Sequence, residues 1–313
     1  MTDSHRDGAP PAAAGSAPTM TVGEVRQAGA RYLGDQGVDN ARFVIEMLLC
    51  EVLGWPRLRL YLDFDRPLGA AERDRLRALV RRAALGEPWQ YIVGHTEFYG
   101  HRIEVGPGAL IPRPETELLV DQCVAWARKE APGAALRAAD VGTGSGCIAI
   151  ALAHALPGLD VAALDSSPTA LAVAAANLAA HRLEGRIRLA AANLLSAVRP
   201  GTLDLVIANL PYIAAEEVPR LPRSVREHEP RVALDGGPGG LALIRQLIDQ
   251  AAAALRPAGW LGLEVGLGQA TAVVAELGRG PWVEIASRRD YGGMDRIVAA
   301  CRAGGTAGRV PEG

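Results

Sequence analysis

Short apolar runs alternate with amphipathic segments through the second half of the chain. Seven runs have the length of buried strands, at 138–141, 161–164, 187–190, 203–208, 260–265, 283–287 and 294–299. Between most of them, apolar residues recur at helical intervals, which predicts helices at 148–156, 168–181, 241–255 and 269–277. This alternation predicts a mainly parallel sheet between helices. Only a short charged turn separates the last two runs, so we expect them to form an antiparallel hairpin.

The first third of the chain has a helical pattern instead. Helices are predicted at 41–53 and 70–85, and Thr21 and Glu24 have the spacing of a capping box. These features predict a small α-helical domain. The arginines of the 70–85 helix form either a solvated face or a docking surface for an acidic or RNA-rich partner.

Two short runs around Gly100, at 96–99 and 102–105, predict a β-hairpin that links the two domains. Pro112 and Pro114 then interrupt regular structure, and a helix is predicted after them at 115–129. The first residues are rich in Ala, Pro, Gly and Ser, which is typical of disorder. We therefore expect a disordered tail at 1–20, a helical domain at 21–88, a hairpin linker at 89–112, an α/β domain at 113–302 and a flexible tail at 303–313.

Composition narrows the function classes. The chain has 313 residues, of which 49% are apolar and 22% charged, and a net charge of −2, which argues against duplex nucleic acid as the main partner. The absence of a signal-peptide pattern and of a long apolar run predicts a cytoplasmic protein without a membrane anchor. We expect a monomer. The scattered cysteines predict reduced and mostly buried thiols, with no metal site or disulfide: Cys50, Cys123, Cys147 and Cys301.

A glycine-rich turn follows the first predicted strand of the α/β domain. Its glycines have the spacing G-x-G-x-G. Dinucleotide sites have the longer spacing G-x-G-x-x-G instead, and that spacing leaves room for a pyrophosphate at a helix N-terminus. A preceding carboxylate, Asp140, suits the positive amino and sulfonium groups of S-adenosylmethionine. The alternative is a glycine-rich turn between strand and helix that binds no ligand. The turn supplies the candidate donor-binding residues Asp140, Gly142, Thr143, Gly144, Ser145 and Gly146.

Polar side chains also follow the next two predicted strands. Asp165 ends the second strand and is placed to accept hydrogen bonds from both ribose hydroxyls of the donor. Asn193 and Leu194 follow the third strand, where they could meet the adenine amino group and ring face. With a terminal hairpin strand, the sheet is predicted to have seven strands, which suits a methyltransferase better than an all-parallel dehydrogenase sheet.

The segment Asn-Leu-Pro-Tyr follows the fourth strand and is the candidate acceptor site. An amide nitrogen is a poor nucleophile, and two hydrogen-bond acceptors aimed at its N–H groups would free its lone pair for in-line attack on a methyl group. The Asn209 side-chain oxygen, which could also meet the donor, and the Leu210 carbonyl can serve as these acceptors. Pro211 disfavours helical angles at Leu210, and Tyr212 offers a flat face for a planar amide. The alternative is a proline-induced turn.

These motifs make the chain resemble the HemK/PrmC family, which methylates the glutamine amide of the Gly-Gly-Gln motif in peptide-chain release factors. The resemblance covers about residues 21–300. It implies a Rossmann-like class I methyltransferase domain that uses S-adenosyl-L-methionine and yields S-adenosyl-L-homocysteine, and a helical domain that grips class 1 release factors to modulate translation termination. The segments that carry it are 87–92, 98–100, 110–117, 140–146, 209–212, 229–231 and 233–237. Of these, the resemblance implies that 110–117 helps to enclose the bound donor.

The chain departs from the family pattern at two positions. Leu210 stands where the family motif Asn-Pro-Pro-Tyr has its first proline, so the carbonyl is kept but the ring that restricts φ is lost. Asn193 stands where an acid is common, and its amide oxygen can still accept a hydrogen bond. We expect retained chemistry with a less rigid acceptor loop.

Three other functions compete with this interpretation. An adenine-N6 DNA methyltransferase would act on a similar planar amine, the exocyclic amine of adenine. Such an enzyme would need a base-reading module and a basic channel, which the chain does not clearly supply. A ribosomal-protein glutamine methyltransferase is disfavoured by the segment 113–117. A non-catalytic donor-binding module or RNA-associated adaptor would not need Asn209 and Tyr212.

Overall fold

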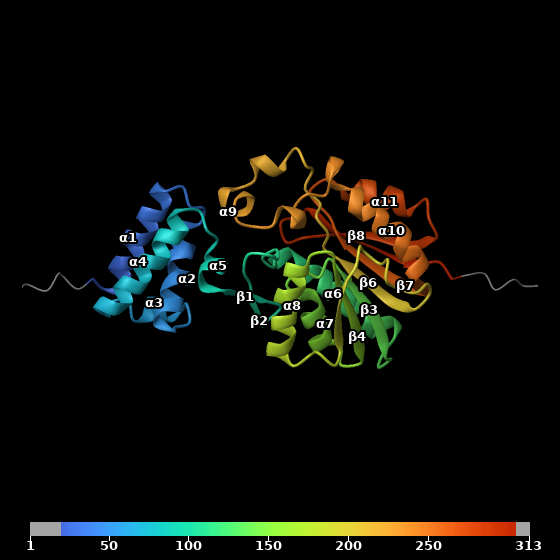
Figure 1. Cartoon of the computed structure of the whole chain (residues 1–313), viewed down its shortest axis with the longest axis horizontal. Helices are drawn as coiled ribbons and strands as arrows, with labels where there is room; N and C mark the ends of the chain where they lie inside the picture. The colour runs from blue at the N-terminus through green and yellow to red at the C-terminus, as the bar shows by residue number, and fades with distance from the viewer. Residues whose placement is uncertain (1–19, 305–313) are drawn as a thin grey trace, which may run out of the picture. The chain divides into compact units, whose positions relative to one another are not determined.

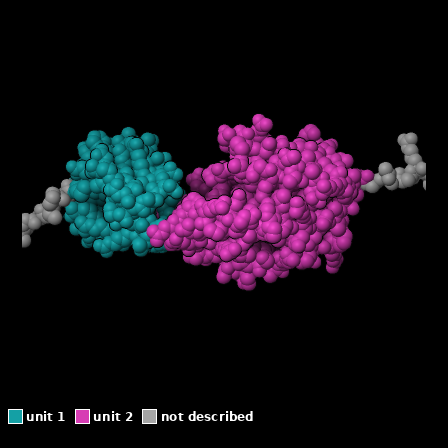
Figure 2. Space-filling view, turned by 90° about the horizontal axis from the view of Figure 1, so that it is seen from above, with its two compact units in different colours: residues 1–89 teal, residues 90–313 magenta. Residues whose placement is uncertain are grey.

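The computed structural model describes residues 20–304, which divide into two compact units split after Trp89 (Figure 2). The predicted tails therefore lie outside the described residues, apart from Met20, Ala303 and Gly304. The predicted linker hairpin belongs to the second unit. None of the described helices is both long and apolar enough to span a bilayer.

The first unit is helical, as predicted. Its helices are α1 (Val22–Asp35), α2 (Ala41–Leu53), α3 (Arg59–Leu62) and α4 (Ala70–Ala84), and α5 (Trp89–Val93) begins at the boundary. The capping box is present: Thr21 Oγ1 accepts from the amide of Glu24, and Glu24 Oε2 accepts from the amide of Thr21 at 2.8 Å. The sequence did not predict the short helices α3 and α5.

The second unit opens with a hairpin and then forms the sheet. The hairpin pairs β1 (His95–Phe98) with β2 (His101–Glu104). Seven strands make the sheet in the order β5-β4-β3-β6-β7-β9-β8. Strand β9 is antiparallel to both β7 and β8, which confirms the predicted terminal hairpin. The strands are β3 (Leu136–Val141), β4 (Leu159–Asp165), β5 (Ile187–Ala191), β6 (Leu203–Ala208), β7 (Leu255–Glu264), β8 (Trp282–Arg289) and β9 (Asp295–Arg302).

Helices cover both faces of this sheet (Figure 1). One hydrophobic cluster joins the sheet to α6 (Glu117–Glu130), α7 (Cys147–Ala155) and α8 (Pro168–His181), and a second joins it to α10 (Ala242–Ala254) and α11 (Ala270–Leu277). The neighbours Ala138 and Ala139 of β3 belong to different clusters, because successive side chains of a strand point to opposite faces. This is the predicted three-layer arrangement.

Smaller elements fill the connections that the sequence analysis left undivided. A 3₁₀ turn, η1 (Pro114–Thr116), precedes α6, and the long connection after β6 holds η2 (Val218–Arg220), α9 (Arg223–Arg226), η3 (Arg231–Ala233) and η4 (Pro238–Gly240). Strand β7 begins earlier than the predicted 260–265 run, directly at the end of α10. All four cysteines are free thiols and three are buried, which agrees with the predicted reduced and mostly buried thiols.

Candidate functional site

The two predicted loops leave the same edge of the sheet. Strands β3 and β6 are parallel neighbours, and their registered pair Val141 and Ala208 are the last residues of each strand. The glycine turn and the Asn209 segment therefore start side by side, where the strand order reverses, which is the usual ligand site of an open α/β sheet. A cavity of about 400 Å³ lies there.

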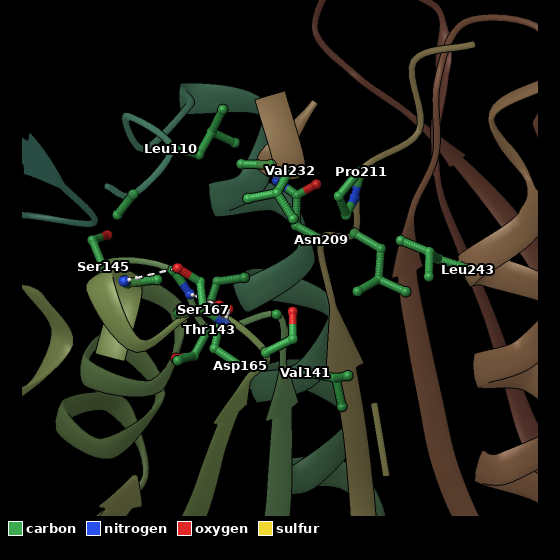
Figure 3. Close-up of a pocket in the computed structure, with 18 of the residues that line it drawn as sticks. Leu110, Val141, Thr143, Ser145, Asp165, Ser167, Asn209, Pro211, Val232 and Leu243 are labelled. Atoms are coloured by element: carbon green, nitrogen blue, oxygen red, sulfur yellow. Dashed lines mark hydrogen bonds between the residues drawn. The ribbon is translucent and has the colours of Figure 1, made fainter. Parts of the chain in front are cut away.

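Most of the predicted site residues line this cavity. Figure 3 draws Thr143, Ser145 and Asp165 on one side of it and Asn209 and Pro211 on the other. The full set of predicted residues in the wall is Gly142, Thr143, Gly144, Ser145, Asp165, Asn193, Leu194, Asn209, Leu210 and Pro211. Asp140, Gly146 and Tyr212 are not part of the wall.

Contacts between the loops explain the need for glycine at the first position of the turn. Gly142 has a φ of +73°, and a Cβ placed there would lie 3.0 Å from Leu210 Cδ2. A side chain at this position would be strained by its backbone conformation and would press on the acceptor loop. The predicted donor and acceptor segments are therefore in contact.

Asp165 is held by backbone amides at the cavity wall. Its Oδ2 accepts from the Gly144 amide at 2.9 Å, and its Oδ1 accepts from the Ser167 amide at 2.8 Å. Each carboxylate oxygen can accept more than one hydrogen bond. The carboxylate is thus fixed in orientation and still has acceptor capacity for a pair of hydroxyls.

The Ser145 hydroxyl in the cavity wall indicates whether the cavity suits a polar ligand. Its side chain is buried, it lines the cavity, and its Oγ has no hydrogen-bond partner within the described part of the chain. Buried hydroxyls are nearly always hydrogen-bonded in folded proteins. A polar group bound in the cavity would satisfy this hydroxyl, so the wall fits a ligand such as the predicted donor.

Asp140 does not face the cavity as the sequence predicted. It is fully buried, and its Oδ2 accepts from Thr143 Oγ1 at 2.6 Å and from the Ala149 amide at 3.2 Å. It therefore ties the glycine turn to the first turns of α7. Its Oδ1 has no partner among residues 20–304. Burial raises the pKa of this carboxyl group to about 7.

The raised pKa gives a testable dependence of stability on pH. Because the folded-state pKa lies above the unfolded value, protonation of Asp140 stabilises the fold below about pH 4, and this stabilisation is lost as the pH rises through about 7. Asp140→Asn removes the titration. We expect its free energy of unfolding, relative to the unsubstituted protein, to increase between pH 4 and pH 8 in urea titrations without donor. A constant difference would contradict the assignment.

Gly146 and Tyr212 also have places that differ from the prediction. Gly146 precedes α7 with a φ of +82°, and a Cβ there would lie 3.3 Å from Leu178 Cδ1, so this glycine permits close packing of α7 on α8. The Tyr212 hydroxyl donates to Glu264 Oε1 at 3.3 Å, and burial raises the tyrosine pKa to about 12. Its main-chain oxygen accepts from Gln269 Nε2 at 2.8 Å, which draws the segment away from the cavity after Pro211.

The Asn209 side chain is held by two residues that sequence reasoning did not single out. Its Nδ2 donates to Thr116 Oγ1 at 2.9 Å, and Thr116 Oγ1 donates to Glu264 Oε2 at 2.6 Å. Thr116 and Glu264 are each only 2% exposed. The sequence offered one signal for this arrangement: Glu264 is an acid at the end of the apolar run of β7. Burying a charge there costs free energy unless the charge has hydrogen-bonding partners.

The cavity roof comes from segments that the family resemblance had marked. Glu229, which is buried, accepts from Arg113 Nη2 at 2.5 Å and from the Ile111 amide at 3.1 Å. The Tyr91 hydroxyl donates to the Ala109 carbonyl at 2.8 Å. These three hydrogen bonds hold the stretch 108–116 against the cavity, whose wall includes Gly108, Ala109, Leu110, Pro112, Arg113, Thr116, Arg231, Val232, Ala233 and Asp235.

Comparison with known proteins decides the family. The profile described as the PrmC N-terminal domain matches residues 24–94, and the one described as the methyltransferase small domain matches residues 116–222. The release factor glutamine methyltransferase of Geobacter sulfurreducens is 42% identical over 267 residues, which cover 85% of this chain and 92% of that relative. The chain belongs to the release factor glutamine methyltransferases.

Other members of the release factor glutamine methyltransferase family agree with this assignment. The protein of Gloeobacter violaceus is 43% identical over 256 residues, covering 81% of this chain and 88% of the relative. Among solved structures, the hMettl16 catalytic domain in complex with MAT2A 3'UTR hairpin 6 covers 75% of this chain and 84% of its own, with 18% identity and a TM-score of 0.51. That likeness shows the fold alone. The predicted class I methyltransferase fold and methyltransferase activity are thus confirmed.

Proposed function

We propose that this enzyme transfers a methyl group from S-adenosyl-L-methionine to the side-chain amide nitrogen, N5, of the glutamine in the Gly-Gly-Gln motif of class 1 release factors, and so modulates translation termination. The observation that carries the proposal is the meeting of the glycine turn and the Asn209 segment in one cavity, in a chain 42% identical to a release factor glutamine methyltransferase.

The donor half of the cavity suits S-adenosyl-L-methionine, which supplies a methyl group on a positively charged sulfur. Asp165 has acceptor capacity for the ribose hydroxyls, and Ser145 has an unsatisfied buried hydroxyl. Asn193 and Leu194 line the wall where the adenine is predicted to bind. The cavity wall includes no phosphate-binding G-x-G-x-x-G turn.

The acceptor half suits a primary amide. Since Asn209 Nδ2 is engaged by Thr116, the side-chain Oδ1 is the atom left to accept from an amide N–H of the substrate. Leu210 and Pro211 line the cavity beside it. Catalysis then rests on positioning and on preorganised acceptors that draw the nitrogen lone pair towards the methyl group.

The first unit is our candidate for gripping the release factor. Around α3 it exposes three large apolar side chains within seven positions of the chain: Leu58 and Leu62 are each 69% exposed and Phe64 is 56% exposed. Such clusters are typical of protein–protein surfaces. A protein substrate also fits a cytoplasmic, monomeric enzyme that does not bind DNA directly, and these three properties stay predictions.

This surface gives a prediction about substrate affinity. We expect Leu62→Asp to raise the KM for the release factor about tenfold, because a charge replaces a buried contact at the interface, while kcat and donor affinity stay unchanged. Leu85→Asp, at a residue 67% exposed beyond α4, serves as the matched control. Equal KM values for the two variants would exclude α3 from the docking surface.

The proposed reaction is tested by incubating the enzyme with labelled donor and a class 1 release factor, its Gly-Gly-Gln glutamine→alanine variant, a ribosomal protein mixture, or adenine-containing DNA. Mass spectrometry then locates the methyl group. We expect one methyl group on the glutamine N5 and none on the alanine variant. Label in the ribosomal proteins or DNA, with an unlabelled release factor, would overturn the proposal.

A further inference from the structure

Three histidines from separate elements meet away from the cavity. His101 lies on β2, His154 in the last turn of α7 and His181 at the last position of α8. One ring nitrogen of each lies within 4.8 Å of the other two. The cavity is lined by the opposite, N-terminal ends of α7 and α8, so this cluster does not belong to the methyl-transfer site.

The hydrogen bond of His181 settles which of its nitrogens carries a lone pair. Its Nε2 lies 2.8 Å from the Arg102 carbonyl oxygen, and because a carbonyl can only accept, Nε2 carries the proton. Nδ1 is then unprotonated and accepts from His154 Nε2 at 3.4 Å, and His154 would bind a metal through Nε2 in its other tautomer. This separation matches the edge of about 3.4 Å between two ligands of a tetrahedral Zn²⁺ with bonds of about 2.1 Å. A backbone carbonyl holding the far nitrogen is also the usual support of a metal-binding histidine.

Two groups near the cluster set its electrostatics, the Arg186 guanidinium and the C-terminal ends of two helices. The guanidinium of Arg186 is itself bound by three carbonyls at the end of α7 and start of β4, from Ala153, Leu156 and Leu159. The C-terminal ends of α7 and α8 present partial negative charge to the cluster.

We propose that His101, His154 and His181 bind one divalent transition-metal ion of the Zn²⁺ class, which ties the β1–β2 hairpin to α7 and α8. His154 Nε2 and His181 Nδ1 already lie at the separation expected of two ligands of one metal ion. The His101 ring stacks on His154 with centroids 4.3 Å apart, and one of its ring nitrogens lies within 4.8 Å of the other two ligand nitrogens. The sequence predicted no metal because these histidines are far apart in the chain and form no ligand-spaced motif.

The test uses the full-length protein, purified with chelator and titrated with ZnCl₂ against a chromophoric Zn²⁺ indicator. We expect one equivalent to bind, and affinity to fall at least about tenfold in His154→Ala and in His181→Ala. His228→Ala, a histidine outside the cluster, should bind like the unsubstituted protein. Co²⁺ should give the visible absorption bands of a four-coordinate site. Non-saturable binding, or the same affinity in all variants, would overturn the proposal.

An independent observation, the hydrogen-bond chain around Asn209, carries a second inference, which rests on the proposed function. Glu264 accepts from Thr116 Oγ1 through Oε2 and from the Tyr212 hydroxyl through Oε1. Glu264 is the acceptor in both hydrogen bonds, so the Thr116 proton points at Glu264. The Thr116 oxygen then accepts from Asn209, which forces Nδ2 towards Thr116 and leaves Oδ1 for the substrate.

We infer that Thr116 and Glu264 are positioning residues, which set the orientation of the Asn209 carboxamide without touching the reacting nitrogen. A flipped carboxamide would present Nδ2, a donor, to the amide N–H groups of the substrate. The chain of hydrogen bonds therefore selects the catalytic orientation from two that have almost the same shape.

Thr116→Val keeps the shape of the side chain but removes its hydroxyl, so we expect kcat on the release factor to fall about 10- to 100-fold, with donor affinity unchanged and a lower melting temperature, because Asn209 and the buried Glu264 lose a partner. Thr116→Ser should restore most of the rate. Full activity in the valine variant, or no rescue by serine, would contradict the inference. Failure of the unsubstituted enzyme to methylate any release factor would instead contradict the proposed function.

Discussion

Asn209→Ala is expected to lower kcat for release factor methylation by about 10²- to 10³-fold, the usual cost of removing one preorganised polar group at a reacting centre. The variant loses Oδ1, the acceptor that we assign to the substrate amide. Donor affinity should stay nearly unchanged, because the glycine turn and Asp165 are intact. Single-turnover transfer measures the first quantity and isothermal titration with the donor measures the second.

Asn193→Ala is the matched comparison for this variant. It removes a carboxamide from the other side of the cavity, where the adenine is predicted to bind. We expect weaker donor binding with a nearly normal rate at saturating donor. If Asn209→Ala instead abolishes donor binding, its assigned role in the acceptor site is wrong.

Asp165→Ala is expected to weaken donor binding by about 10²-fold or more, because two hydrogen bonds to a charged group are lost together. The substitution also frees the Gly144 and Ser167 amides, which the carboxylate now holds at 2.9 Å and 2.8 Å. The glycine turn therefore loses part of its support as well. Donor titration by calorimetry gives the affinity directly.

Two variants separate these contributions. Asp160→Ala removes an exposed carboxylate from the opposite end of the same strand, β4, and should bind the donor normally. Asp165→Asn retains one oxygen acceptor and should lie between the two in affinity. Unchanged donor affinity in Asp165→Ala would refute the predicted ribose contact.

Strand and helix positions followed from local pattern, and they were accurate because this fold is built from contiguous apolar segments. The predicted strand 203–208 has the same bounds in the structure, and the helix 168–181 also agrees. The largest errors fall where local pattern is weak. The short helices α3, α5 and α9 hold only four or five residues each, too few to show a helical period.

The candidate site divides in the same way. Glycine spacing and residues at strand ends located the cavity wall, since parallel strands bring their carboxyl ends to one edge. Side-chain direction was beyond the sequence: Asp140 turns towards α7 and Tyr212 towards Glu264, where each finds a hydrogen-bonding partner. Buried polar groups are placed by the partners that satisfy them, and those partners come from remote segments.

By itself, the sequence determined the two-part organisation, the class of sheet, and the positions of the glycine-rich turn and of the Asn209 segment at strand ends, because each depends on neighbours within about ten residues. Only the tertiary structure decided which groups face one another across the chain. Thr116 reaches Asn209 over 93 positions, and His101 meets His181 because β2 packs beside α8. Such encounters depend on how elements pack, and no local period or spacing encodes them.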